Sequence, residues 1–437
     1  MKQSQKVVIV IIAILTCLQV ANGQNNPIEK IIDWSNDDRP CDLIKTNDNG
    51  YVLLLKSISN VCVLKLDSEG DSVWSYCFDS DNSSVRFKMK VIQSSNNDFL
   101  IASEYDRDCY LLRLNNDGDS IDSFVYPGIE YFSSFNDVDE LDNGDLIIVS
   151  KTYSDSWPLQ NLYRFKANGE LVWKKVYTTD QISNVVITSD SSCLMIKSDI
   201  YNTVSQFYDL DGNKTFKYYL GLGQGVEIIE SFDGFYYSAH FGETNDTLNC
   251  VKKLDGEGNV LWGLFDPTDY NFPLSISSLK PDLLSVCGGI NEELIIKFFN
   301  PDGDSLSSFI YNNYTSQYAR NVCLDGDNIV ISAGIIDSLD NRSLLFLKLP
   351  LDSVLVNTSS HQLIHDSPFY PNPANDKIFF KEKDKPKEIV IYNINGQKVI
   401  VKNNVTNELN TSFLRNGIYA LEILQDNRGK KFLLIIN

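Results

Sequence analysis

The sequence predicts an all-β protein, made of a seven-bladed β-propeller followed by a small Ig-like β-sandwich. Three observations lead to this prediction. A unit of about 45 residues recurs along the body of the chain, which is typical of four-stranded propeller blades. No window shows sustained helical periodicity of about 3.6 residues. The C-terminal residues form a separate set of short apolar runs. Rings of six or eight blades remain alternatives.

The N-terminus has the pattern of a signal peptide over residues 1–23. Lys2 and Lys6 form a basic start, residues 7–20 form an apolar core, and residues 21–23 end in small side chains. The apolar core is shorter than the ~20 residues that a membrane-spanning helix needs. We therefore expect an exported protein that has no transmembrane span once the signal is removed.

The repeats occupy residues 24–356. The first repeat contains the turns Asp48-Asn49-Gly50 and Asp67-Ser68-Glu69-Gly70, each placed between apolar strands. These turns need a positive φ, at which a side-chain β-carbon is strained. A seventh copy, residues 321–356, has Pro350-Leu351 in place of the second-turn glycine. In the other copies this glycine recurs at intervals of 43 to 51 residues, as Gly70, Gly118, Gly169, Gly212, Gly258 and Gly303.

Two segments compete to complete the last blade. Residues 28–34 resemble a fourth strand that arrives before the first blade begins, so they could join the two ends of the ring. Residues 354–356 could fill the same outer position. Residues 357–368 are polar and are expected to form a linker to the C-terminal domain, residues 369–437.

Eight cysteines remain after removal of the signal peptide, and one pair stands out. If residues 68–71 form a four-residue hairpin loop, Asp67 faces Ser72 and Cys62 faces Cys77. Directly opposed strand residues lie within reach of a disulfide. Either a disulfide or two buried thiols would fit the sequence.

The C-terminal domain should consist of short strands. Pro371 and Pro373 fix an extended entry segment, and Asn395-Gly396 is a hairpin signal. The strand-like runs are residues 378–380, 388–392, 398–401, 417–424 and 432–436. This pattern suggests a small β-sandwich.

Four motifs in this region, in order, resemble the C-terminal sorting domain of the type IX secretion system of Bacteroidota. They include Pro371, Asn372, Pro373, Gly396, Gly417, Tyr419 and Lys431. The resemblance implies that the secretion machinery handles residues 369–437, and that the protein is released or stays at the cell surface after passing through the periplasm. It names no activity.

The body also resembles secreted bacterial propeller repeats of the quinoprotein type, in which a Trp follows the turn glycine by four residues. Gly70/Trp74, Gly169/Trp173 and Gly258/Trp262 keep this spacing. Asp122, Phe216 and Ser307 stand where three other repeats should have the Trp. The resemblance supports the fold, but these replacements weaken the case for a quinone, and we expect no cofactor.

The charge distribution indicates which kinds of partner the protein can bind. The net charge is −20, although residues 369–437 hold 11 Lys and Arg against 7 Asp and Glu. An acidic body argues against nucleic-acid binding, which needs patches of Lys and Arg. We expect a monomer.

Signals for catalysis are weak. Only three histidines are present, and His240 alone lies within the repeats. His361 and His365 lack the glutamate of a zinc motif, and residues 209–213 resemble a calcium loop without its final glutamate. We predict no metal site.

The loops expected on one face of the ring carry aromatic, acidic and amide side chains, which suit sugar rings. Packing against neighbouring loops is the alternative explanation for them. The candidate ligand-binding residues are Tyr105, Arg107, Tyr131, Tyr153, Trp157, Tyr270, Phe272 and Tyr314. We therefore predict an exported binding module for a glycan or another protein.

A secreted glycoside hydrolase or lyase is the main alternative, and a quinone-dependent dehydrogenase is a weaker one. Hydrolysis would need two carboxylates about 5–10 Å apart. The candidates are Asp106, Asp108, Glu130, Asp155 and Asp269. A pair of buried carboxylates in a central pocket would favour an enzyme, whereas a plugged channel would favour binding.

Overall fold

A computed structural model gives the fold as two compact units, and the second unit contains residues 355–437. None of the helices in the described part of the chain has the length and apolar character needed to cross a bilayer. The structure describes residues 27–35, 37–80, 89–126, 133–152, 159–177, 181–189, 192–198, 202–222, 224–241, 250–265, 274–290, 292–337, 341–355, 369–370, 374, 377–380, 388–393, 398–403, 408–415, 417–425 and 428–436.

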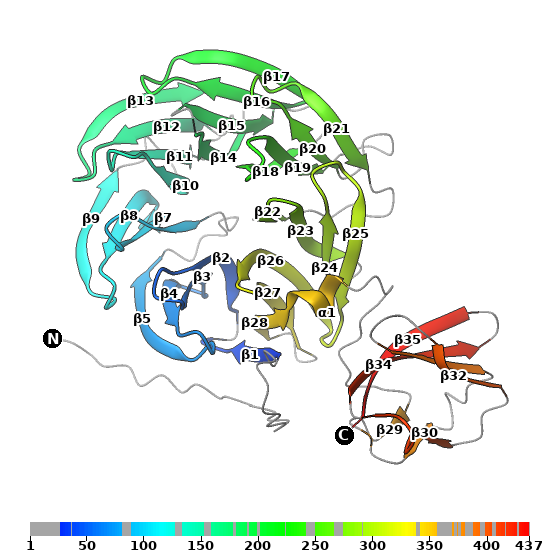
Figure 1. Ribbon diagram of the computed structural model, residues 1–437. Helices are drawn as coiled ribbons and strands as arrows, with labels where there is room; N and C mark the ends of the chain where they lie inside the picture. Colours follow the sequence, from blue (N-terminus) through cyan, green and yellow to red (C-terminus); the bar gives the residue numbers. More distant parts are fainter. Residues whose placement is uncertain are drawn as a thin grey trace. The chain divides into compact units, whose positions relative to one another are not determined.

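The first unit is a ring of four-stranded antiparallel sheets, the architecture of a β-propeller (Figure 1). In chain order the first three sheets are β2(Arg39–Lys45) to β5(Ser72–Asp79), β6(Lys90–Gln93) to β9(Ser120–Tyr126), and β10(Ser133–Glu140) to β13(Leu171–Tyr177). The next three are β14(Gln181–Ile187) to β17(Lys214–Leu222), β18(Gln224–Glu230) to β21(Val260–Phe265), and β22(Ser275–Lys280) to β25(Ser305–Tyr311). The last sheet has the order β1(Ile28–Ile32), β28(Arg342–Pro350), β27(Asn328–Ile336), β26(Ser316–Asp325).

The last sheet closes the ring with strands from both ends of the first unit. β1 occupies the outer position and pairs antiparallel with β28, so that Ile28 lies opposite Lys348. The competing assignment of residues 354–356 to this position is wrong, because Leu351–Leu355 form the short helix α1. Leu351 and Val354 are three residues apart and both are buried, which is helical spacing.

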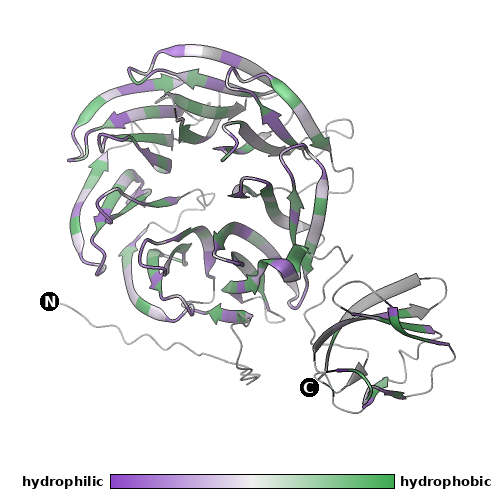
Figure 2. Cartoon of the chain, in the orientation of Figure 1, coloured by the Kyte–Doolittle hydropathy of each residue, from purple (hydrophilic) through white to green (hydrophobic). Residues whose placement is uncertain are grey.

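Apolar side chains fill the spaces between neighbouring sheets. One cluster joins Val52 and Leu54 of the first sheet to Phe99 and Ile101 of the second. Similar clusters lie between the second and third sheets, the third and fourth, the fourth and fifth, and the last and first. In Figure 2 the hydrophobic residues lie mainly along the strands and the hydrophilic ones at the turns. Each sheet therefore depends on its neighbours for burial of its faces.

The turn glycines adopt a positive φ, and they also allow a side chain of the neighbouring sheet to come close to the turn. Gly118 has φ 82°, and a β-carbon there would lie 2.6 Å from Cδ2 of Trp74 in the preceding sheet. The indole Nε1 of Trp74 donates a hydrogen bond to the carbonyl of Asn116 in the same turn, at 3.0 Å. Trp173 and Trp262 contact Gly212 and Gly303 in the same way. The spacing of Gly and Trp that recurs in three repeats therefore serves contacts between adjacent repeats.

Where Asp122 replaces the Trp, a different aromatic residue makes this contact. Phe124, two residues further along β9, lies against Gly169 of the third sheet, where a β-carbon would come within 2.5 Å of its ring. Gly70 of the first sheet faces Phe346 of the last sheet. An aromatic ring against the turn glycine is thus kept even where the Trp pattern is lost.

Gly118→Ala is expected to lower the free energy of unfolding by about 2–3 kcal/mol, because backbone strain adds to overpacking against Trp74. Gly234 is the matched control. It has φ 75°, but a β-carbon there would meet no atom within 4 Å. Gly234→Ala should therefore cost only about 1 kcal/mol. Chemical denaturation of both variants checks the difference, and equal losses would contradict the close-contact role.

A disulfide joins Cys62 and Cys77, which lie directly opposite each other on β4(Asn60–Leu66) and β5. The predicted pairing of Asp67 with Ser72 is wrong, since Leu66 pairs with Ser72 and a register shift follows at Lys65. The cause is local, because the Asp67 carboxylate accepts bonds from the backbone N–H groups of Glu69 and Asp71 and draws Asp67 into the turn. The shift restores the alignment of the two cysteines.

The C-terminal unit contains two small sheets around one apolar cluster. The first has the order β29(Phe369–Tyr370), β30(Lys377–Phe380), β33(Glu408–Asn410), and the second β32(Lys398–Asn403), β31(Glu388–Tyr392), β34(Gly417–Gln425), β35(Arg428–Ile436). Ile378, Ile389, Leu421 and Leu434 are fully buried in the cluster. The sequence missed β29 and β33, because both are too short to show alternation.

Candidate functional site

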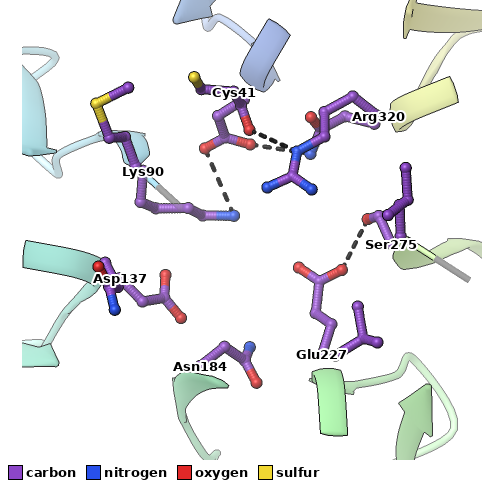
Figure 3. Close-up of a pocket in the computed structure, with 13 residues that line it drawn as sticks. Cys41, Lys90, Asp137, Asn184, Glu227, Ser275 and Arg320 are labelled. Atoms are coloured by element: carbon purple, nitrogen blue, oxygen red, sulfur yellow. Dashed lines mark hydrogen bonds and ion pairs between the residues drawn. The ribbon is translucent and has the colours of Figure 1, made fainter. Parts of the chain in front are cut away.

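The candidate site lies where the innermost strands of the ring converge (Figure 3). The inner strand of each sheet contributes at least one polar side chain to it, and one in each sheet lies at the same place in the repeat. These residues recur at the spacing of the repeat, and they are Asp42, Lys90, Asp137, Asn184, Glu227, Ser275 and Asn321. We call this set the axial residues.

A β-bulge precedes most of the axial residues. The register of the inner strand shifts directly before Asp42, Asp137, Asn184, Glu227 and Asn321. A bulge re-aims the following side chain and breaks the strict alternation of the strand. Asp42 can therefore point toward the axis although Cys41 and Leu43 on either side of it are also buried.

The axial carboxylates connect each sheet to the next. Asp42 Oδ2 accepts a hydrogen bond from the backbone N–H of Val91 at 3.0 Å, and Asp137 Oδ2 accepts one from Val185 at 2.8 Å. Glu227 Oε2 accepts bonds from the N–H of Ile276 and the hydroxyl of Ser275, at 3.0 and 2.7 Å.

The amide groups of two asparagines make the same kind of connection. Asn184 exchanges two bonds with the backbone of Ile228 in the fifth sheet, at 2.9 and 3.0 Å. Asn321 in the last sheet donates to Asp42 Oδ1 in the first, at 3.0 Å. The axial residues therefore brace the ring from the inside, including the junction between its ends.

Burial dominates the electrostatics of these groups. Asp42 is 1% exposed and Asp137 is 5% exposed. Burial raises the pKa of Asp42, and it raises the pKa of Asp137 to about 7 despite the favourable charge of Lys90. Asp42 in turn raises the pKa of Lys90, whose Nζ lies 3.6 Å from Asp42 Oδ2. Burial also raises the pKa of the Cys41 thiol to about 12, so this cysteine is a poor nucleophile at neutral pH.

The raised pKa of Asp137 predicts a pH dependence of stability. The pKa of Asp137 is about 7 in the folded protein, against an ordinary value of 3.8. Folding therefore favours the protonated form of this carboxyl group, and protonation of Asp137 stabilises the folded state. This contribution is lost as the pH rises from about 4 to about 7. The free energy of unfolding of Asp137→Asn, compared with that of the parent protein at the same pH, should therefore be about 2 kcal/mol more favourable at pH 8 than at pH 5. Denaturant unfolding at both pH values measures the difference.

A control for this prediction lies in an exposed turn. The pKa of Asp255 is lowered, because hydrogen bonds from Asn259 outweigh its slight burial. Asp255 is thus ionised throughout this pH range, and the stability of Asp255→Asn relative to the parent should stay level. A level profile for Asp137→Asn would contradict the assignment.

The axial residues line a small cavity. Its volume is about 40 Å³, and the rest of its wall consists of Cys41, Met89, Asn136, Val226, Leu274 and Arg320. Typical small-molecule sites have volumes of about 300–1,000 Å³. The cavity at the centre of the ring is therefore smaller than a typical small-molecule site.

The predicted ligand-binding residues within the described part of the chain come from two places. Tyr105 is 40% exposed at the end of β7(Phe99–Tyr105), and its ring centroid lies 5.3 Å from that of Tyr110. Asp106 and Arg107 form a tight turn in which both residues have positive φ, and β8(Asp108–Leu114) begins at Asp108. Tyr314 belongs to the connection after β25, and its hydroxyl contacts Glu29 Oε1 at 3.2 Å.

Some of the remaining predicted residues lie in the described part of the chain, and the others lie outside it. Gly417 and Tyr419 lie on β34, and Lys431 on β35 pairs with Glu422. His240 lies on β19(Tyr236–Phe241) opposite Cys250. Outside the described residues are Glu130, Tyr131, Tyr153, Asp155, Trp157, Asp269, Tyr270, Phe272, His361, His365, Pro371, Asn372, Pro373 and Gly396.

The axial residues were not predicted from the sequence. A signal was present, because a polar residue recurs at one place in the first strand of the repeats. The calcium-like segment at Asp209 is a hydrogen-bonded turn, in which Asp209 Oδ1 accepts bonds from the N–H groups of Asp211 and Asn213.

Comparison with known proteins identifies the C-terminal region. Residues 368–437 match the secretion system C-terminal sorting domain. This domain marks proteins exported by type IX secretion, so the protein is secreted or displayed at the cell surface. No curated protein matches the chain.

Several solved structures are similar to the chain at low sequence identity. The Dos1 propeller is 13% identical, with a TM-score of 0.46, and the match covers 70% of this chain and 77% of that one. The polysaccharide lyase Uly1 is 10% identical, with a TM-score of 0.46, covering 70% and 89%. A protein of unknown function from Dyadobacter fermentans is 11% identical, with a TM-score of 0.45, covering 74% and 97%.

Proposed function

Because residues 368–437 form a sorting domain for export, we propose that the chain delivers a seven-bladed β-propeller out of the cell as a binding module. In this proposal the propeller spans residues 24–356, a linker spans 357–368, and an Ig-like sandwich spans 369–437. The sheets from β2–β5 to the one closed by β1 are the seven blades. The ligand is a glycan, bound outside the central cavity.

The proposal rests mainly on the hydrogen bonds that the axial carboxylates make. A glycoside hydrolase places two carboxylates on either side of a bound sugar. Here Asp42, Asp137 and Glu227 instead accept hydrogen bonds from backbone N–H groups of the next sheet, around a cavity of about 40 Å³. A carboxylate used in this way supports the ring.

The binding face follows from the strand order. Strands alternate in direction within each sheet, so the turns between second and third strands leave at the same end as the connections to the next sheet. Tyr105 and Arg107 lie in such a turn, and Tyr314 lies in such a connection. An exposed aromatic ring beside a guanidinium group suits the apolar face and hydroxyl edge of a sugar.

One observation favours a carbohydrate-active enzyme as a second candidate. Asp137 has a pKa of about 7, which is where a general acid or base works best at neutral pH. An enzyme of this kind would need the sugar to enter the axial cavity. Release of shortened products from a bound polysaccharide would establish this alternative.

The test is a glycan array with the full secreted protein, followed by titration of the best ligand and by product analysis. Tyr105→Ala and Arg107→Ala should each weaken binding about tenfold or more. Ile121→Ala is the control, because Ile121 is exposed at the start of the outer strand β9, at the end of the sheet opposite to the turn that holds Tyr105 and Arg107. Failure to bind any glycan, or equal losses in all three variants, would overturn the proposal.

A further inference from the structure

Three aromatic side chains lie in a row on β5, the outer strand of the first sheet (Figure 1). Trp74, Tyr76 and Phe78 alternate with exposed residues, and each of the three is itself partly exposed. Alternate residues of a strand share one face. The three rings therefore point to the same side of β5, where they pack against the apolar cluster shared with the second sheet. We call these three residues the aromatic strip.

The aromatic strip continues to the glycan-binding face proposed above. The ring centroid of Phe78 lies 5.1 Å from that of Tyr110, which in turn lies 5.3 Å from that of Tyr105. Tyr110 is buried, whereas Tyr105 is 40% exposed. From Trp74 to Phe78 the strip spans about 14 Å, because a strand rises about 3.4 Å per residue. Aromatic rings therefore extend from Tyr105 over a distance longer than one sugar ring.

The neighbouring outer strand, β9, faces the aromatic strip with small or aliphatic side chains. Val125 pairs with Tyr110 and Ser123 pairs with Leu112, and directly paired residues lie on the same side of a sheet. Because Tyr110 and Leu112 belong to the cluster between the first two sheets, Val125 and Ser123 also point toward the first sheet. Both are exposed. Neither β5 nor β9 contains a Lys or Arg, and each contains one Asp.

We propose that the aromatic strip extends the glycan site, and that the ligand is an unbranched, neutral, β-1,4-linked polysaccharide bound along its length. This inference rests on the proposed function. Aromatic rings stack on the apolar C–H faces of sugars. A β-1,4-linked chain is extended and presents such faces one after another, so it can lie from Tyr105 along β5. The lack of Lys and Arg on β5 and β9, within an acidic body, favours a neutral chain over an anionic one.

The length dependence of binding tests this inference. The experiment is calorimetric titration of the full secreted protein with oligosaccharides of two to six residues, made of β-1,4-linked glucose, mannose, xylose or N-acetylglucosamine. Affinity should rise about tenfold or more from the disaccharide to the hexasaccharide in at least one series, because only the longer chain reaches the aromatic strip. Equal affinity at both lengths, or no binding in any of the four series, would overturn the inference.

A charged chain of the same length tests the expected neutrality. The hexasaccharide of β-1,4-linked mannuronate carries one carboxylate on each residue but otherwise resembles the mannose series. It should bind at least about tenfold more weakly than the best neutral hexasaccharide, because β5 and β9 contain no cation to receive the carboxylates. Tighter binding of the mannuronate chain would contradict the proposed ligand class.

Matched substitutions locate the contact. Tyr76→Leu and Phe78→Leu keep an apolar side chain against the neighbouring cluster but remove the flat ring. Each should weaken hexasaccharide binding about fivefold and leave disaccharide binding unchanged. Phe232→Leu is the control, because Phe232 is 67% exposed but lies in the turn between β18 and β19, far from β5 in the chain order of the sheets. Unchanged hexasaccharide binding in the two β5 variants, or an equal loss in Phe232→Leu, would overturn the inference.

The results separate this inference from the proposed function. Tyr105→Ala should weaken the binding of every chain length, whereas the two leucine variants on β5 should affect only the longer chains. If the glycan array finds a ligand that binds without length dependence, the proposed function stands and the role of the aromatic strip is wrong. If the array finds no ligand, both fail.

Discussion

Removal of residues 24–34 is expected to cost at least about 5 kcal/mol, a large part of the stability of a typical domain. This deletion takes away β1, which supplies the outer strand of the last sheet. It uncovers the backbone edge of β28 and the apolar cluster that contains Leu344, Phe346 and Tyr51. It also removes the contact of Lys30 with Asp71, which ties β1 to the first sheet. Denaturant unfolding and limited proteolysis of the truncated chain measure the loss.

A synthetic peptide of residues 24–36 provides a sharp control for this result. It should bind the truncated chain and restore much of the lost protection, because the empty position next to β28 matches its register. A peptide of the same composition in scrambled order should have no such effect. A truncated chain as stable as the parent would show that β1 does not close the ring.

Asp42→Ala is expected to destabilise the protein by about 3–5 kcal/mol. The side chain is 1% exposed and accepts bonds from Val91 in the second sheet and Asn321 in the last. Alanine leaves these donors and the ammonium group of Lys90 without their acceptor. Asp42→Asn keeps one acceptor oxygen and should lose less. Equilibrium unfolding in denaturant gives both values.

Asp255→Ala is the matched control for Asp42. Asp255 also accepts backbone N–H bonds, from Glu257 and Asn259, but within one exposed turn of one sheet. Its loss should cost only about 1 kcal/mol, because water can solvate the freed donors. Similar losses at positions 42 and 255 would mean that bonds between sheets at the axis have no special weight.

Part of the candidate site could have been predicted from the sequence. The polar residue in the first strand of the repeats was visible, and its spacing pointed to one shared location. The role of this residue could not be predicted, because the hydrogen bond from Val91 to Asp42 joins residues that are 49 positions apart and belong to different sheets. The bulges before Asp42 and Asp137 also leave no distinct residue pattern, since many side chains tolerate the bulged position.

The sequence by itself determined the repeating strands, the glycine turns and the export domain. These features depend on local backbone preference or on motifs within a short stretch, such as the positive φ at Gly118. Only the tertiary structure decided between β1 and residues 354–356, placed Phe124 where a Trp was missing, and set the volume of the axial cavity. Those outcomes depend on how side chains from distant repeats pack together, and packing is a property of the closed ring rather than of any one repeat.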